Sequence, residues 1–211
     1  MPSPILRQVD LANALTLTGL MLTVLSVVLA VQGHVHAALL ALMAAGITDL
    51  FDGLVARRTR RTDLQAEVGK HLDSLVDVCS FGFGPAVLGY SYGLRHPVAV
   101  VVLMAFVGAA AMRLAYFNSV GMTSEGDDRF FTGLPVTYVA LVLPLGFLAT
   151  LVWPADLVKP ALLGLYLALA VAMVSGVRIV KPRGIWYAIF PMIALVLAGI
   201  YGWALITGRA A

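Results

Sequence analysis

Residues 11–31 read LANALTLTGLMLTVLSVVLAV, a run of 21 residues without a charged side chain. As an α-helix, a run of this length crosses the ~30 Å hydrocarbon core of a bilayer. The whole chain of 211 residues has the same character, with 61% hydrophobic residues, 12% charged residues and a mean hydropathy of +0.95. Soluble domains carry about 25% charged residues, so the composition excludes a soluble fold. The run shows no clear cleavage site, and we expect a membrane helix rather than a signal peptide.

Six further apolar stretches follow the first one along the chain. The breaks between them carry turn or charge signals and are too short for a soluble domain. Backbone groups in lipid must be satisfied within each segment, so the stretches are expected to be helices. We predict an all-α, polytopic integral membrane helix bundle of six to eight transmembrane helices, of which seven are assigned. The predicted spans are residues 11–31, 36–57, 69–91, 97–118, 134–152, 157–180 and 185–207.

Basic residues gather in the loops that helix parity places on one side of the membrane. This excess is typical of the cytoplasmic side, so we predict a cytoplasmic N-terminus and a bacterial or archaeal cell membrane. The C-terminus is then expected on the opposite side. The net charge of +3 comes without a basic tract interleaved with aromatic residues, so no nucleic-acid partner is expected. The basic residues of this side are Arg7, Arg57, Arg58, Arg60, Arg61, Lys70, Arg178, Lys181 and Arg183.

Four of the 11 acidic residues lie at the cytoplasmic ends of the second and third predicted spans. Asp49 and Asp52 belong to TDLFDGLVAR (residues 48–57), and Asp73 and Asp77 belong to GKHLDSLVD (residues 69–77). The spacings i, i+3 and i, i+4 put each pair on one helical face. Consecutive spans are antiparallel, so the four carboxylates can converge at one depth, and the active site is expected at the cytoplasmic interface.

Four carboxylates in a poorly hydrated place repel one another unless they are protonated, paired with cations or bound to metal. Oxygen ligands favour Mg²⁺, Mn²⁺ or Ca²⁺, and two divalent ions could neutralise the cluster. The alternative is that these residues merely flank helices at the interface. We favour a metal site, because charge inside a membrane span is costly. The single Cys79 excludes a cysteine-rich metal site.

Small residues surround the acidic positions. Gly53 follows Asp52 directly, so that a phosphate could approach the backbone there. Ala56 keeps the same helical face clear, and Arg57 ends the helix where a phosphate or a carboxylate could be met. Close helix packing is the alternative explanation of Gly53 and Ala56.

The order Asp49-x-x-Asp52-Gly53-x-x-Ala56-Arg57, then Gly69-x-x-x-Asp73-x-x-x-Asp77, resembles the signature of the CDP-alcohol phosphotransferase family. One departure is visible. The family usually has about eight residues between the Arg and the second Gly, whereas this chain has eleven, residues 58–68. The additional residues fall in the loop, so neither helical face changes register, and the departure concerns only the part of the loop that could contact lipid or nucleotide.

Within that family the chain is most similar to the phosphatidylserine synthases. The similarity rests on LDSLVDVCSFGFGPA (residues 72–86), RLAYFN (113–118), FTGLP (131–135) and MVSGVRIVKP (173–182), and Asn13 and Thr16 fit the wider family. The resemblance implies transfer of the phosphatidyl group from CDP-diacylglycerol to the hydroxyl of L-serine, with release of CMP. It also implies a homodimer and Mg²⁺ or Mn²⁺, as two ions. We assign residues 1–183 to the family domain and 184–211 to an additional C-terminal helix.

Site roles follow from the same resemblance. Asp49, Asp52 and Asp73 are expected to ligate metal, and Asp77 to contribute to the second ion and act as general base. Asp73 and Asp77 form the expected catalytic pair. The residues expected to line the nucleotide site are Asp52, Gly53, Ala56, Arg57 and Gly69.

The acceptor pocket must hold the carboxylate and the ammonium of serine. Arg113 lies inside the fourth predicted span, where a charge indicates function. The alternatives are a structural partner for a motif Asp and snorkelling toward the interface. Asn118, Arg178 and Lys181 are further candidates, with helix capping or topology as their alternative roles.

The same sequence features are compatible with other functions. The same chemistry could use glycerol 3-phosphate, inositol phosphate or another alcohol. A phosphorylated acceptor would need several converging cations, and Arg113 is the cation well inside a span. An intramembrane prenyltransferase and a cation transporter are more distant alternatives, since their acidic motifs have other spacings or lie near the bilayer midplane.

Overall fold

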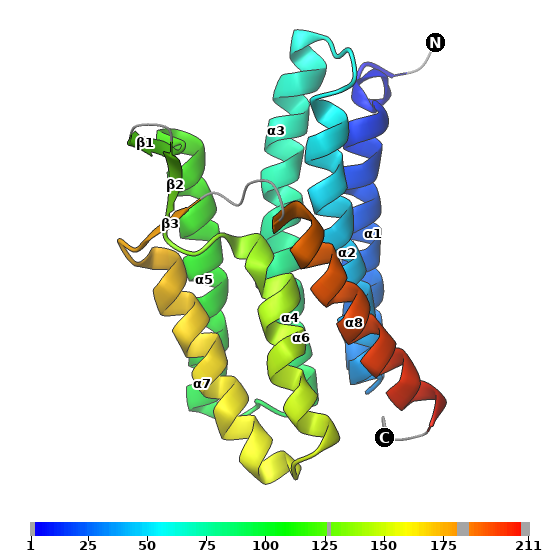
Figure 1. Cartoon of the computed structure of the whole chain (residues 1–211), viewed down its shortest axis with the longest axis vertical. Helices are drawn as coiled ribbons and strands as arrows, with labels where there is room; N and C mark the ends of the chain where they lie inside the picture. Colours follow the sequence, from blue (N-terminus) through cyan, green and yellow to red (C-terminus); the bar gives the residue numbers. More distant parts are fainter. Residues whose placement is uncertain (1–2, 126–127, 181–185, 208–211) are drawn as a thin grey trace.

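The computed structural model describes residues 3–125, 128–180 and 186–207, which form a bundle of long helices with a small sheet at one end (Figure 1). The helices are α1 (Leu11–Val31), α2 (Val35–Ala56), α3 (Asp63–Asp77), α4 (Gly84–Tyr92), α5 (Pro97–Val120), α6 (Val139–Phe147), α7 (Ala155–Val174) and α8 (Trp186–Ile206). Shorter helical pieces are the 3₁₀ turns η1 (Leu6–Gln8), η3 (Val136–Tyr138) and η4 (Leu148–Leu151) and the π-helix η2 (Val78–Phe83). The strands are β1 (Thr123–Glu125), β2 (Asp128–Thr132) and β3 (Arg178–Val180).

The predicted polytopic bundle is confirmed. Six helical stretches of the described chain are long and apolar enough to span a membrane, and Val136–Leu151 is a shorter apolar helical stretch. Together they match the seven predicted runs one for one. As a result α1 begins at one end of the bundle and α8 ends at the other (Figure 1).

The third span begins earlier than predicted. It runs without a break through α3, η2 and α4, from Asp63 to Tyr92. The prediction began at residue 69 because the preceding residues are polar, yet Thr62 and Gln65 form a capping box that starts the helix there. More than half of the long 58–68 connection is therefore helical.

Two predictions at the other end of the chain are corrected. The helix predicted over residues 157–180 ends at Val174, and residues 178–180 form β3. The three strands make one antiparallel sheet in the order β1-β2-β3, which the all-α prediction did not contain. Ser175 turns to an extended backbone, and the backbone N–H of Gly133 donates to the carbonyl of Val177 (2.8 Å). This pairing diverts the chain from helix to strand.

The core lies between helices, and large apolar side chains cover the outside. Small or polar residues of α1, among them Gly19, Thr23 and Ser26, face α2, α3 and α4 and let the helices approach closely. Leu39, Phe81, Phe106, Leu143 and Tyr166 fill the apolar centre. Met21, Val101 and Leu167 are examples of exposed apolar side chains, as expected of a lipid-facing surface.

The last helix is packed into the bundle rather than appended to it. α8 contacts α2 and α6. The Tyr201 hydroxyl donates to the carbonyl of Pro144 (2.5 Å), and its ring lies 5.4 Å from that of His36. The boundary predicted at residues 183 and 184 lies outside the described residues, and the division into two domains stays a prediction.

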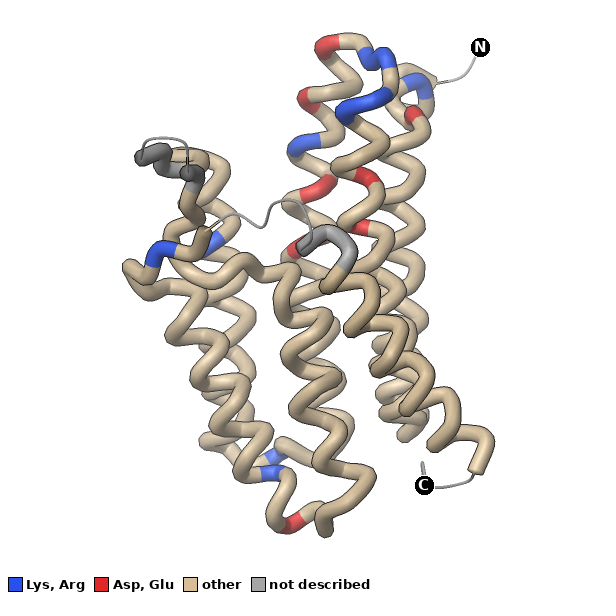
Figure 2. Tube along the Cα trace, viewed as in Figure 1, with Lys and Arg blue, Asp and Glu red and all other residues tan. Residues whose placement is uncertain are grey.

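Charge is distributed unevenly along the bundle. Figure 2 shows Lys and Arg gathered at the end where α2 meets α3, with acidic residues just inside them and few charges at the opposite end. This polarity agrees with the predicted side of the basic loops. The cytoplasmic assignment of that side, and the cell membrane it belongs to, stay predictions.

Candidate metal centre and substrate pockets

The acidic motif forms a cluster between α2 and α3. One carboxylate oxygen from each of Asp49, Asp52 and Asp73 lies within 4.8 Å of the other two. Asp77 lies beside this group, close enough to Asp49 for the two side chains to act on one another and to line one small cavity together. The prediction was that four carboxylates converge. In the structure three of them form one group, and the fourth, Asp77, lies next to Asp49.

No acid of the cluster forms an ion pair with a described cation, although the charges of Arg61 and Arg113 act on Asp52 and Asp77 from a greater distance. Asp52 and Asp77 are buried, with 6% and 7% of their surfaces exposed. Arg61 and Asp10 form an ion pair with a nitrogen–oxygen distance of 2.6 Å. Among the described residues, no ion pair within 4.0 Å involves an acid of the motif. The one hydroxyl bonded to the cluster is that of Thr16, which donates to Asp52 Oδ2 (2.5 Å). Hard oxygen donors that lie close together, partly or fully buried and without an ion pair to a described residue, fit a divalent ion such as Mg²⁺ or Mn²⁺.

A polar pocket of about 260 Å³ opens beside the cluster between α1, α2 and α3. Its lining contains four of the five residues that were predicted to line the nucleotide site. Arg57, the fifth, is the exposed C-cap of α2 and does not line this pocket. The lining consists of Ala12, Asn13, Thr16, Asp52, Gly53, Ala56, Arg61, Ala66, Gly69, Lys70 and Asp73.

Gly69 shapes this pocket by having no side chain. A Cβ at this position would collide with the guanidinium of Arg61 and the side-chain oxygen of Asn13. Arg61 was predicted only as a topology-setting charge. The local sequence pattern did not predict it as a pocket residue, because its position depends on contacts with the start of α1 and the start of α3.

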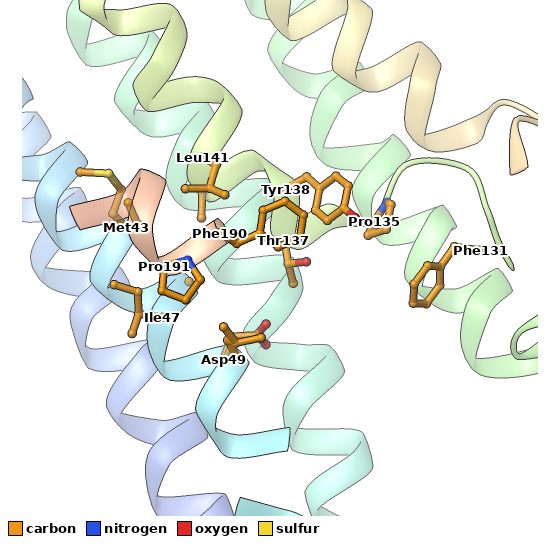
Figure 3. Close-up of a pocket in the computed structure, with 14 residues that line it drawn as sticks. Met43, Ile47, Asp49, Phe131, Pro135, Thr137, Tyr138, Leu141, Phe190 and Pro191 are labelled. Carbon is orange, nitrogen blue, oxygen red and sulfur yellow. The ribbon is translucent and has the colours of Figure 1, made fainter. Parts of the chain in front are cut away.

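An apolar cavity of about 190 Å³ adjoins the other side of the cluster (Figure 3). Asp49 lies at one end of it, and most of the remaining wall is apolar. Residues from α2, from the stretch that runs from β2 into α6, and from α8 surround it. They are Met43, Gly46, Ile47, Asp49, Leu50, Phe131, Pro135, Thr137, Tyr138, Ala140, Leu141, Phe190, Pro191 and Ala194.

Arg113 of α5 lies near the acidic cluster and is 7% exposed. Its guanidinium carbon lies 5.0 Å from the ring centroid of Phe117 and 5.7 Å from that of Phe131. Asp77 and Tyr138 are the groups whose charges act on it. Its Nε is buried and makes no hydrogen bond to any residue that the structure describes. The aromatic contacts of Phe131 and the nearness of Tyr138 were not predicted, since both residues lie far from Arg113 in sequence.

The other predicted acceptor residues are more dispersed. Asn118 is exposed and its amide donates to the hydroxyl of Ser74 on α3 (2.7 Å). Arg178 is exposed on β3, where it pairs with Thr132 of β2. Lys181 lies outside the described residues.

The fold and the site define a polytopic membrane protein with a carboxylate cluster that borders a polar and an apolar cavity. The sequence model of the CDP-alcohol phosphatidyltransferase family matches residues 9–205. The chain belongs to this family, as the acidic signature predicted. Membership argues against the prenyltransferase and transporter alternatives.

Relatives carry related names. The archaetidylserine synthase of Methanothermobacter thermautotrophicus is 37% identical over 120 residues, which cover 56% of this chain and 49% of the relative. The CDP-diacylglycerol–serine O-phosphatidyltransferase of Saccharomyces cerevisiae is 39% identical over 105 residues, 47% of this chain and 37% of the relative. The protein of that name from Helicobacter pylori is 32% identical over 173 residues, 79% and 70% respectively. The chain matches half or less of the length of the first two relatives.

Proposed function

We propose that this protein transfers the phosphatidyl group of CDP-diacylglycerol to the hydroxyl of L-serine, giving phosphatidylserine and CMP. The observation that carries the proposal is the position of the acidic cluster between two unlike cavities. A polar pocket borders Asp52 and Asp73, and an apolar cavity borders Asp49. A nucleotide joined through a diphosphate to a diacylglycerol has the same division into polar, anionic and apolar parts.

The carboxylates would hold the divalent ions that the family uses. Asp49, Asp52 and Asp73 are the ligands for which the cluster geometry gives support, and Asp77 would complete a second site from its place beside Asp49. Bound Mg²⁺ or Mn²⁺ would neutralise the charge of the diphosphate and of the departing CMP. Gly53, Ala56 and Gly69 keep the polar pocket open for the nucleotide.

The transfer requires a base for the serine hydroxyl. As that proton moves to the Asp77 carboxylate, the serine oxygen forms a bond to the phosphorus next to the lipid. The bond from that phosphorus to the oxygen bridging it to CMP breaks, and CMP leaves with the bond electrons. A positioned base contributes typically 10²–10⁴-fold to such a step. The burial of Asp77 beside Asp49 supports this role.

Arg113 is the residue best suited to the serine carboxylate. It is buried, it is close enough to Asp77 for their charges to interact, and its Nε lacks a hydrogen bond to any described residue. A guanidinium binds a carboxylate through paired hydrogen bonds. Asn118, Arg178 and Lys181 have weaker support, since Asn118 bonds to Ser74, Arg178 is exposed and Lys181 is outside the described residues.

The test is CMP release by the purified protein in detergent with CDP-diacylglycerol and Mg²⁺ or Mn²⁺. Serine, glycerol 3-phosphate and inositol phosphate are offered in parallel, and CDP-archaeol replaces CDP-diacylglycerol in a second series because one relative is named for an archaetidyl product. We expect release that depends on serine and stops with EDTA. An Asp52→Asn variant is the inactive control. Release only with a phosphorylated alcohol would contradict the serine assignment and leave the reaction class standing.

A further inference from the structure

Arg61 comes from the connection between α2 and α3, yet it lines the polar pocket. Its side chain is 12% exposed, unlike that of Arg60, which is exposed. Arg61 Nε donates to Asp10 Oδ2 (2.6 Å), and Nη2 donates to Asn13 Oδ1 (2.6 Å) and to the Gln65 carbonyl (2.9 Å). The start of α1 and the first turn of α3 therefore hold one guanidinium.

The residues that hold Arg61 are themselves fixed. Asp10 is the N-cap of α1 and accepts from the backbone N–H of Asn13 (2.8 Å). The Asn13 amide donates to the Gln8 carbonyl (2.8 Å) and to the Gln65 carbonyl (3.5 Å). An arginine ordered in advance loses little side-chain entropy when it binds a ligand.

The remaining donors of the pocket are few. Asn13 uses its amide and its side-chain oxygen within the protein, and the Thr16 hydroxyl donates to Asp52. Arg61 retains Nη1, which makes no hydrogen bond to a described residue. Lys70, which is exposed, is the other cation of the lining.

Arg61 is also close enough to Asp52 for their charges to interact. Asp52 belongs to the acidic cluster, where the proposed function puts the diphosphate of the substrate. Under the proposed function, a guanidinium near that point would be next to the phosphate groups of the substrate. Arginine binds phosphate through charge-assisted hydrogen bonds, which are stronger than neutral ones.

We propose that Arg61 is a substrate-binding residue that contacts the phosphate of the cytidine nucleotide through Nη1, and that Asp10 and Asn13 are its positioning residues. The proposal rests on the proposed function, since it takes the nucleotide lipid as the ligand of this pocket. It assigns a binding role to the segment between α2 and α3, outside the acidic signature.

The test compares equilibrium binding of CDP and of cytidine to the full chain in detergent with Mg²⁺. Arg61→Gln is measured against Arg60→Gln, which removes the same charge from an exposed side chain of the same connection. Loss of a hydrogen bond to a charged group lowers affinity about tenfold to a hundredfold. We expect that loss for CDP with Arg61→Gln, little change for cytidine, and wild-type binding of both with Arg60→Gln.

Two results would overturn the proposal. One is equal CDP affinity in the two variants. The other is an equal loss for CDP and cytidine in Arg61→Gln, which would make Arg61 a wall of the pocket and not a phosphate contact. If Arg61→Gln does not fold, Asp10→Asn decides. This variant keeps Arg61 but removes the charge that holds it, so the affinity for CDP should fall more than the affinity for cytidine. An unchanged ratio of the two affinities would reject the positioning role of Asp10.

The outcome is separable from that of the proposed function. Binding of CDP needs no acceptor alcohol, so a wild-type protein that binds CDP but transfers nothing to serine leaves the Arg61 result standing. If the wild-type protein does not bind CDP, that result rejects both the assignment of the polar pocket to the nucleotide and the role of Arg61.

Discussion

Asp77 and Arg113 are the two residues whose surroundings say most about the reaction. Both are buried, they come from α3 and α5, and the charge of Asp77 acts on the guanidinium of Arg113. The proposed base for a hydroxyl and the proposed anchor for a carboxylate lie near one another, as an amino acid that attacks through its side-chain oxygen would require. Each residue can be tested by one substitution.

Replacing Asp77 by Asn removes the proposed base with a side chain of the same shape. We expect turnover to fall by at least the 10²–10⁴-fold that general bases typically contribute. Binding of CDP should stay largely intact, because Asp49, Asp52 and Asp73 still form their group. The measurements are the rate of CMP release and CDP binding on the same preparation. Full activity in this variant would reject the base assignment.

Replacing Arg113 by Ala removes the proposed carboxylate anchor. Loss of charge-assisted hydrogen bonds costs about 1.5–3 kcal/mol, or roughly tenfold to a hundredfold in affinity. We expect the KM for serine to rise by that factor, while the KM for CDP-diacylglycerol changes little. Arg113→Lys is the control that keeps the charge without the planar fork, and it should recover part of the loss. Equal effects on both substrates would remove Arg113 from the acceptor pocket.

At the scale of elements, the sheet and the π-helix η2 are the elements next to Arg113 and Asp77. β2 carries Phe131, which packs near Phe117 and lies over the guanidinium of Arg113. Backbone bonds from Gly133 and Leu134 tie the end of β2 to α7 and to the residues after it. η2 follows Asp77 directly and keeps the third span continuous. π-turns within helices are frequent at functional sites.

Gly133 tests the link between the sheet and Arg113. Its φ of +72° is in the left-handed region, and a Cβ would collide with the backbone carbonyl oxygen of Met173. The backbone conformation costs a non-glycine residue about 1–3 kcal/mol, and the collision adds to it. We expect Gly133→Ala to lower the Tm in detergent and to raise the KM for serine, because Phe131 moves relative to Arg113. Gly176→Ala, where a Cβ meets nothing within 4 Å, is the control. An unchanged Tm and KM in Gly133→Ala would contradict this account.

At the scale of the whole molecule, seven apolar helical stretches put the acidic cluster and the basic loop at the same end of the bundle (Figure 2). The water-soluble parts of both proposed substrates would have to reach that end, so its orientation would fix which compartment supplies them. The excess of basic residues predicts the cytoplasm.

Thiol labelling in cells measures the orientation. Arg60→Cys and Asp156→Cys place an exposed thiol at opposite ends of the bundle, each in a Cys79→Ser background. A membrane-impermeant maleimide should label position 156 in intact cells and position 60 only after permeabilisation. The reverse pattern would put the active site outside the cell.

The homodimer is a prediction of the resemblance. The mass of one chain is 22.3 kDa, so light scattering of the detergent complex distinguishes one copy from two once the detergent mass is subtracted. We expect two copies at all concentrations at which the protein is active. A single copy with full activity would reject the dimer.

Short-range pattern was enough to predict the spans, the acidic cluster and the small residues Gly53 and Ala56 beside it, which line the polar pocket. Apolar length reports a span, and helical spacing reports a shared face, so both can be read along the chain. The sheet, the Arg61 anchor and the aromatic contacts of Arg113 could not be read in this way. Arg61 meets Asp10 across 51 positions, and the pairing of β2 with β3 requires α6 and α7 to return the chain. Such contacts depend on how the helices pack, which no local periodicity records.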